Sequence, residues 1–153
     1  MPDSLFLLAL ESVGASEFGS SNNYAESDLK KAVDKWLEDM GKRGLDNAKL
    51  IPREIDLTTL DGSGCYGKLS VKAAPLTLDE AREYADIIPN AERWCWLATG
   101  WSGPSKSDGD LALYVDSNGD WNSNRCSISD GIRPALKVPS ILFEDSEAGL
   151  DLS

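Results

Sequence analysis

The segment LALYVDSNGDWNSNRCSI, residues 111–128, has the pattern of a β-hairpin. Apolar and aromatic side chains dominate its first part, polar side chains dominate its second part, and Asn118-Gly119 lies between them. Asn-Gly is the residue pair that type I′ turns favour most. We therefore expect two antiparallel strands joined by a tight turn centred on this pair.

The same turn has some of the features of a calcium loop. Asp116, Asn118 and Asp120 match the first ligand positions of an EF-hand. The match then fails, because Trp121 stands where the sharp turn needs glycine and Ser127 where the bidentate Glu should be. Asp and Asn are also ordinary turn residues, so a plain hairpin without a metal ion or cofactor is favoured. A weak calcium site at residues 116–120 stays open as the alternative.

Two helices are expected before the hairpin. Ser27 can cap the first helix, and two glycines end it. A capping box of Thr77 and Glu80 begins the second helix, which Pro89 ends. The apolar stripe of the first helix is Leu29, Ala32, Val33, Trp36, Leu37 and Met40, and that of the second is Leu78, Ala81, Tyr84, Ala85 and Ile88. The charged residues opposite the first stripe are expected to be a solvated surface.

The remaining segments predict a strand, a loop and a tail. LFLLAL, residues 5–10, reads as a buried strand, because it is too short to span a bilayer and lacks the basic residues of a signal peptide. The glycine-rich residues 61–67 open no clear helix, so a surface loop is favoured over a phosphate-binding loop. We expect one domain over residues 1–141 and a loosely ordered acidic tail over residues 142–153.

Charge and composition exclude several functions. The 153 residues include 26 acidic and 15 basic side chains and no histidine, for a formal net charge of -11. So little positive charge makes nucleic acid an improbable partner. The absence of histidine removes the Ser-His-Asp and Cys-His arrangements and the imidazole ligands of most catalytic metal sites. The three cysteines, Cys65, Cys95 and Cys126, form neither a C-x-x-C motif nor a complete disulfide framework.

Three motifs carry a family resemblance: residues 96–100 (WLATG), 112–119 (ALYVDSNG) and 131–136 (GIRPAL). They resemble the end of a bacterial and phage domain family of unknown function, which typically reads Trp-Trp-Leu-Arg-Ser-Pro-Gly, then a Val-Asn-x-x-Gly hairpin, then Gly-Val-Arg-Pro-Ala-Leu. Residues 24–37 and 75–81 resemble the helix signatures of that family. The resemblance covers residues 5–139.

The resemblance implies a C-type-lectin-like fold of the formylglycine-generating-enzyme-like branch. The expected class is α+β, with two helices packed on a small twisted antiparallel sheet with long loops. The family's loop-fixing arginine is replaced at residues 98–100, and the strands that usually precede residue 5 are not found. This chain is therefore expected to be part of a longer polypeptide or a shortened relative.

Several such domains are the variable proteins of diversity-generating retroelements, whose last hairpins display a changeable binding site. Rigid aromatic residues with Ser, Asn, Asp and Gly suit such a surface. The expected ligand-binding residues are Trp101, Ser102, Ser105, Lys106, Ser107, Asp108, Tyr114, Asp116, Asn118, Trp121, Asn122, Asn124, Arg125, Ser127 and Ser129. No catalytic residue and no metal ligand is expected.

The codons of these residues divide the expected ligand-binding residues into fixed and variable positions. The single Trp codon ends in G, so it cannot arise from an Asn codon altered at its adenines. Trp101 and Trp121 are therefore expected to be fixed anchors, while Tyr114 and the polar hairpin residues vary. The resemblance also implies a buried scaffold, with Trp94, Trp96, Ile132 and Leu136 in the core and Arg133 bonding loop carbonyls.

The leading hypothesis is a non-catalytic ligand-binding and display domain on a phage or a bacterial surface. Its partner would be a protein or a surface glycan, not nucleic acid, and it would not insert into a membrane. Location and assembly stay open: another segment could place it on a virion or cell surface, it could be cytoplasmic, and it could form a homo-oligomer.

Two alternatives remain. The first is an enzyme of the same fold. Copper-dependent enzymes of this fold need a pair of cysteines, and only Cys126 is near the expected position. Iron-dependent enzymes of this fold need histidine ligands, which this chain lacks. A carboxylate pair such as Asp108 and Asp110 acting on a sugar is less favoured than solvated loop residues. The second is a structural subunit of a virion or cell surface with no ligand site.

Overall fold

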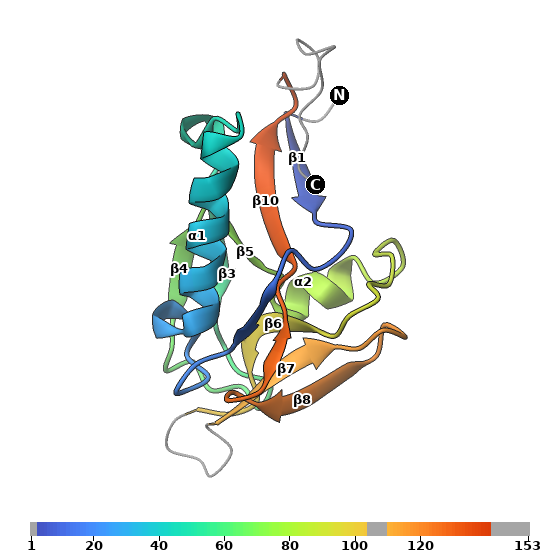
Figure 1. The fold of residues 1–153 in the computed structure, drawn as a ribbon. Helices are drawn as coiled ribbons and strands as arrows, with labels where there is room; N and C mark the ends of the chain where they lie inside the picture. Colours follow the sequence, from blue (N-terminus) through green and yellow to red (C-terminus); the bar gives the residue numbers. More distant parts are fainter. Residues whose placement is uncertain (1–2, 104–109, 142–153) are drawn as a thin grey trace.

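The structure is a computed structural model that describes residues 3–103 and 110–141. These residues form two α-helices, α1 (Asp28–Lys42) and α2 (Leu78–Glu83), two short 3-10 helices (Tyr24–Glu26 and Asn47–Lys49) and ten β-strands. The predicted α+β class is confirmed (Figure 1). The strands form three sheets, not the single small sheet that the sequence predicts.

The three sheets divide the strands as follows. The three-stranded sheet has the order β1 (Ser4–Leu8), β10 (Pro134–Pro139), β5 (Ala73–Pro75). The five-stranded sheet has the order β2 (Ala15–Glu17), β9 (Ser129–Gly131), β6 (Cys95–Gly100), β7 (Leu111–Val115), β8 (Trp121–Arg125). The third sheet pairs β3 (Arg53–Asp56) with β4 (Lys68–Val71). The pairs are antiparallel, apart from β6 and β9, which run parallel where Cys95 meets Gly131.

The short connection from β9 to β10 joins the two larger sheets through Ile132 and Arg133. The guanidinium of Arg133 donates hydrogen bonds to the carbonyl oxygens of Ala9 (2.6 Å), Leu10 (3.1 Å) and Pro89 (2.9 Å). It therefore fixes the chain that follows β1 against the chain that follows α2. The prediction that Arg133 bonds loop carbonyls is confirmed.

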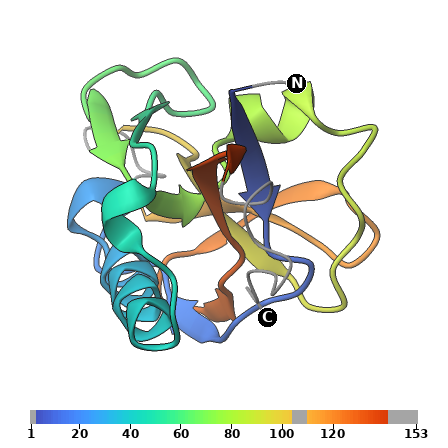
Figure 2. The same ribbon diagram turned by 90° about the horizontal axis from the view of Figure 1, so that it is seen from above.

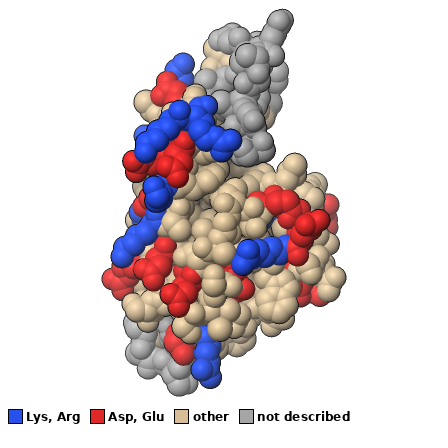
Figure 3. All heavy atoms as spheres, viewed as in Figure 1, with Lys and Arg blue, Asp and Glu red and all other residues tan. Residues whose placement is uncertain are grey.

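Helix α1 forms as its apolar period predicts. The Ser27 side chain accepts a hydrogen bond from the Lys30 amide (2.9 Å) and so caps the helix. The apolar stripe faces the core, with Leu29, Val33 and Met40 buried. Along the opposite face, lysines pair with carboxylates one turn away, as in Lys30–Asp34 (2.7 Å). Figure 3 shows these positive and negative groups alternating along the helix, in agreement with the predicted solvated face.

Helix α2 has the predicted capping box but is shorter than predicted. The Thr77 side chain accepts from the Glu80 amide, and Glu80 accepts from the Thr77 amide. The helix ends at Glu83, where the Ala85 amide donates to the carbonyl of Arg82 (3.3 Å) in a tighter i to i+3 pattern. Ala85, which the helical period places on the buried face, is consequently exposed.

The core lies on two sides of the five-stranded sheet. One cluster includes Trp96, Ile132 and Leu136 and packs toward α1, and a smaller cluster that includes Leu97 packs toward α2. Figure 2 shows the two helices on either side of β1 and β10. Trp96, Ile132 and Leu136 are buried as predicted, whereas Trp94 is 45 % exposed, so its assignment to the core is wrong. Trp94 precedes β6 and stacks on the sheet from outside.

Two further expectations are settled by the fold. The strand predicted over residues 5–10 forms over Ser4–Leu8, but it is not buried as predicted. β1 is a half-buried edge strand and Leu10 is exposed, because β1 pairs with β10 alone. The glycine-rich residues 61–67 form a loop that leads into β4 and not into a helix, so they lack the geometry of a phosphate-binding loop. Neither described helix combines the length and the apolar character needed to cross a membrane.

Candidate functional site

The predicted hairpin forms, but its turn differs from the predicted type. β7 and β8 pair along their whole length, and the turn between them is residues 116–120. The Gly119 amide donates to the Asp116 carbonyl (3.0 Å), and Gly119 has a φ of +86°. Asn118 does not share the positive φ that a type I′ turn requires, so that turn type is wrong. The glycine instead supplies the single left-handed residue of a longer loop.

Asp116 has a structural role in this turn. Its Oδ1 accepts hydrogen bonds from the amides of Asn118 (2.9 Å) and Asp120 (3.0 Å). This is the side-chain turn that Asp commonly forms, and it explains the Asp-x-Asn-x-Asp spacing without a cation. Within residues 3–103 and 110–141, no group of three or more His, Cys, Asp or Glu side chains could hold a metal ion.

The hairpin presents two different faces because side chains alternate along a strand. Val115 and its partner Trp121 lie on the face toward α2, together with Cys95 of β6. Tyr114 and its partner Asn122 lie on the other face. The predicted binding residues of the hairpin are thus divided between two surfaces and cannot contact one small ligand together.

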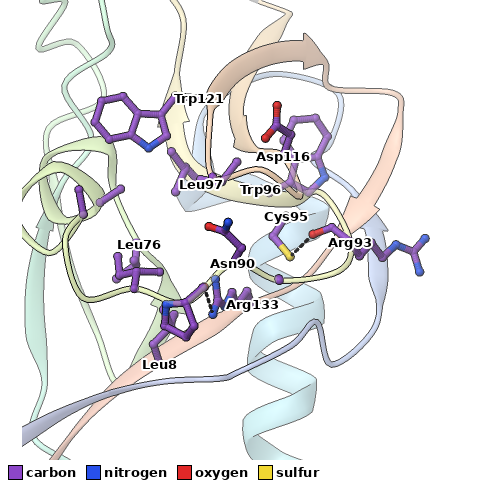
Figure 4. A pocket seen from close by; sticks show the side chains of 17 residues that line it. Leu8, Leu76, Asn90, Arg93, Cys95, Trp96, Leu97, Asp116, Trp121 and Arg133 are labelled. Atoms are coloured by element: carbon purple, nitrogen blue, oxygen red, sulfur yellow. Dashed lines mark hydrogen bonds between the residues drawn. The ribbon is translucent and has the colours of Figure 1, made fainter.

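The face toward α2 borders a pocket, which we call the hairpin pocket (Figure 4). It lies between the turn of the hairpin and the chain that connects α2 to β6. The space between atoms in the pocket and in the open solvent at its mouth is together about 630 Å³. Most of its lining is apolar: Leu8, Leu76, Ala81, Ala85, Ile88, Pro89, Ala91, Leu97, Val115 and Trp121.

A few polar groups line the hairpin pocket. The Asn90 side chain reaches into it, whereas the Arg93 guanidinium points away (Figure 4). Asn90 also lies close to the hairpin turn, since a Cβ on Gly119 would lie 2.6 Å from Asn90 Oδ1. The buried Cys95 thiol donates to the Arg93 carbonyl (3.3 Å). Arg133 also lines the pocket, and its Nε and one terminal nitrogen donate to main-chain carbonyls, which hold the guanidinium in place.

Trp121 forms the exposed edge of the hairpin pocket. Its side chain is 42 % exposed, and the Arg82 guanidinium of α2 lies 5.9 Å from its ring centroid. A cation over an indole face holds the ring in place at modest energy. The predicted role of Trp121 as an exposed aromatic anchor is therefore consistent with its position.

The opposite side of the hairpin carries a second group of side chains, which we call the aromatic face: Trp94, Tyr114, Asn122, Asn124 and Asp130. The Trp94 and Tyr114 rings stack with centroids 5.0 Å apart and an angle of 19° between their planes. Tyr114 meets the buried Trp96 edge to face. Only the outer parts of this group are open to solvent.

The predicted site residues fall into four groups. Ser105, Lys106, Ser107 and Asp108 lie outside the described residues. Ser102 and Tyr114 are 3 % and 6 % exposed, so the expectation that they are exposed contacts is wrong. Ser102 is enclosed where its carbonyl accepts from the buried Asn22, and Tyr114 is covered by Trp94. The exposed members are Trp101, Asn118, Trp121, Asn122, Arg125, Ser127 and Ser129, and Asp116 and Asn124 are half-buried.

Trp101 does not lie beside Trp121. The Trp101 amide donates to the Leu111 carbonyl, at the end of β7 that is farthest from the turn. The two predicted aromatic anchors therefore belong to opposite ends of the hairpin. A single site cannot be built around both of them.

Sequence reasoning missed the side chains that the connection from α2 to β6 contributes. Asn90 and Trp94 come from this connection, and Asp130 comes from β9. Asn90 directly follows Pro89, which marked the end of a helix, and Asp130 directly precedes the Gly-Ile-Arg-Pro-Ala-Leu motif. Neither position carries a spacing signal, because these residues approach the hairpin only through pairing of distant segments.

The cysteines have the chemistry of structural thiols. All three are free, Cys95 and Cys126 are buried, and Cys65 is exposed. Burial raises the pKa of the Cys95 thiol to about 11 and also raises the pKa of Cys126. Both buried thiols are protonated near neutral pH, and a protonated thiol is a poor nucleophile and a poor metal ligand.

Comparison with protein-family models, with curated proteins and with solved structures finds no match to this chain.

Proposed function

We propose that this chain is a non-catalytic binding domain that receives an apolar side chain of a protein ligand in the hairpin pocket. The observation that carries this proposal is the pocket itself, an open and mostly apolar cavity with Trp121 at its edge and Asn90 inside it. Binding sites commonly combine an apolar lining with a few placed polar groups. Trp is also one of the residues most enriched at interface hot spots.

The lining favours a protein ligand over the surface glycan. Leu76, Leu97 and Val115 offer no hydrogen bonds to sugar hydroxyls, and the Asp116 carboxylate already accepts two amides. A sugar in this pocket would leave most of its hydroxyls without partners, which is costly. A leucine-sized side chain would instead exchange water for apolar contacts.

A catalytic role has less support. The pocket's thiol, Cys95, has a pKa of about 11 and is bonded to the Arg93 carbonyl. No His is present to act as a base, and Oδ1 of the pocket's carboxylate, Asp116, accepts two amides of the turn. These features support binding over acid–base or thiol chemistry at this site.

The proposal can be tested with N-acetyl-leucine methylamide as a probe, followed by changes in amide and indole NMR signals. The informative variant is Ala85→Leu, because Ala85 is exposed and lines the pocket, so leucine would fill the mouth without disturbing the core. Ala48→Leu places the same change on a distant exposed alanine.

We expect the probe to shift the Trp121 indole and Asn90 side-chain signals in the unmodified protein and in Ala48→Leu. In Ala85→Leu the affinity should fall by about tenfold or more, as loss of a buried leucine contact predicts. Equal shifts in Ala85→Leu and Ala48→Leu would overturn the proposed site. Shifts caused by methyl N-acetylglucosaminide and not by the leucine probe would favour the glycan.

We also propose, on the resemblance alone, that the domain is displayed and diversified on a phage or bacterial surface. Asn118, Asn122, Ser127 and Ser129 are exposed and could vary without loss of core packing, whereas Tyr114 is enclosed. Sequencing of the gene's surroundings tests this. A reverse-transcriptase gene beside a near-copy of the coding segment for residues 101–136 that differs only at adenines would support it, and their absence would contradict it.

A further inference from the structure

Asp130 is the one buried carboxylate among the described residues with an oxygen that lacks a hydrogen-bond partner. The residue is 6 % exposed, and it is Oδ2 that has no partner. Buried polar atoms without partners are uncommon in proteins, and each one requires an explanation. An unpaired carboxylate needs such an explanation more than a neutral group does, because burial of an unpaired charge costs more free energy.

The position of Asp130 on the aromatic face follows from strand geometry. A Cβ on the next residue, Gly131, would lie 3.0 Å from Cys95 Sγ, on the side of the hairpin pocket. Neighbouring side chains point to opposite faces of a strand, so Asp130 points the other way. It therefore shares a face with Trp94, Tyr114 and Asn124.

The neighbours of Asp130 do not neutralise it. Burial raises the pKa of this carboxyl, while a hydrogen bond from Asn124 and the charge of Arg93 lower it by less. No salt bridge joins Arg93 to Asp130 among the described residues. The fold thus holds a carboxylate beside aromatic rings without supplying a full counter-charge.

Trp94 adds the second half of a recognition site. Tyr114 covers one side of the Trp94 indole at 5.0 Å, and the indole is nevertheless 45 % exposed. Its remaining ring surface is therefore open to solvent on the same face of the sheet as the buried carboxylate. A stacked, exposed indole and an unpaired carboxylate both attract the same chemistry, a positively charged organic group.

We propose that the aromatic face binds an ammonium or guanidinium group, such as a Lys or Arg side chain of a partner protein, between the Trp94 ring and the Asp130 carboxylate. An anion would be repelled by Asp130, and an uncharged apolar group would not balance its charge. The net charge of -11 would draw cationic ligands to this surface as well. The site lies on the face opposite the hairpin pocket, so the test of this proposal does not depend on the proposed function.

The test uses n-butylammonium and n-butylguanidinium as probes, with 1-butanol as the uncharged analogue, on the full chain. Binding is followed by Trp fluorescence and by the NMR signals of the Trp94 indole. The key variant is Asp130→Asn. The matched control is Asp120→Asn, which removes one charge from an exposed residue of the hairpin turn.

We expect both cations to bind and 1-butanol not to bind. Asp130→Asn should weaken binding by about tenfold or more, as for loss of a charge-assisted hydrogen bond. Trp94→Leu should weaken it by about threefold or more, as for loss of a cation–π contact. Asp120→Asn should change it by less than about twofold, because an exposed charge is screened.

Three results would overturn the proposal: absence of cation binding, equal losses in Asp130→Asn and Asp120→Asn, or equal binding of 1-butanol. If Asp130→Asn fails to fold, the test uses the unmodified protein instead. The pKa of Asp130 is then measured from the ¹³C signal of its carboxyl, with and without cation. The groups whose charges act on Asp130 or feel its charge are Arg93, Cys95 and Tyr114. Saturating cation should lower the pKa of Asp130, and an unchanged pKa would contradict the site.

Discussion

Gly131 is a position where the backbone itself leaves no room for a side chain. A Cβ there would lie 2.8 Å from the Trp94 carbonyl oxygen and 3.0 Å from Cys95 Sγ. The Gly131 amide also donates to that carbonyl (2.7 Å), so the two chains cannot separate without loss of this bond. The glycine of the Gly-Ile-Arg-Pro-Ala-Leu motif thus has a steric explanation.

We predict that Gly131→Ala lowers the free energy of unfolding by about 2 kcal/mol, the usual scale of overpacking in a rigid environment. Urea unfolding measures it. Gly64→Ala is the control, because no heavy atom lies within 4 Å of a Cβ there and its cost should stay below about 0.5 kcal/mol. Equal costs at both positions would contradict the close packing of β9 on β6.

Asp130 gives a pH-dependent prediction. Burial raises its pKa above the ordinary value of 3.8 in the folded chain. The folded protein therefore holds this proton more tightly than the unfolded chain, and ionisation of Asp130 costs stability. The cost is absent below the ordinary pKa and is fully present once the pH has risen above the folded pKa.

Asp130→Asn should therefore stabilise the fold by about 1 kcal/mol at neutral pH, the scale of one buried unpaired polar group. The gain should disappear as the pH falls below 3.8. Thermal unfolding across this range measures it, with Asp120→Asn as the exposed counterpart. A variant that is less stable than the unmodified protein at neutral pH would show that Oδ2 of Asp130 has a partner in the fold.

At the scale of elements, the turn of the β7–β8 hairpin depends on one side chain. Asp116 accepts from the Asn118 and Asp120 amides, which would otherwise have no partner within the turn. We predict that Asp116→Ala lowers the free energy of unfolding by about 1 kcal/mol. It should also speed hydrogen exchange at the Asp120 amide. Asp116→Asn should keep most of the free energy of unfolding, because its side-chain oxygen can accept the same hydrogen bonds.

That prediction separates a structural turn from a calcium loop. If the carboxylate serves only the turn, calcium should leave the unfolding temperature of the unmodified protein unchanged. A rise in unfolding temperature with calcium that Asp116→Ala and Asp120→Ala both abolish would contradict our assignment of Asp116.

The elements that local pattern controls were predictable from the sequence. The apolar period of α1, the Ser27 cap, the Thr77 capping box and the hairpin all rest on residues close together in the chain. The length of α2 was not predictable, because the period continues to Ile88 while the backbone tightens after Glu83. The turn type failed for a similar reason, since Asp116 imposes a conformation that Asn-Gly alone does not require.

At the scale of the whole molecule, the arrangement into three sheets depends on distant pairing. β10 lies between β1 and β5, which come from the beginning and the middle of the chain. No local period reports such partners, so the sequence predicted strands but not sheets. The same is true of the candidate sites: Trp121 was predicted, whereas Asn90 and Asp130 reach their places only through tertiary packing.

The division of the hairpin into two faces is also a property of the whole molecule. α2 and the chain after it build a pocket on one side, and β9 and Trp94 build a different surface on the other. A binding partner that uses the hairpin pocket need not contact the aromatic face. The two proposals therefore predict different effects of two variants. Ala85→Leu should weaken binding in the hairpin pocket, and Asp130→Asn should weaken cation binding at the aromatic face.

Selection of peptides from a displayed random library on the immobilised full chain tests the central claim, binding of a protein ligand in the hairpin pocket, most directly. We predict that selected peptides share an apolar anchor residue and that Ala85→Leu weakens their binding by about tenfold or more, while Ala48→Leu does not. Failure to enrich any peptide, or binding that Ala85→Leu leaves unchanged, would contradict the claim.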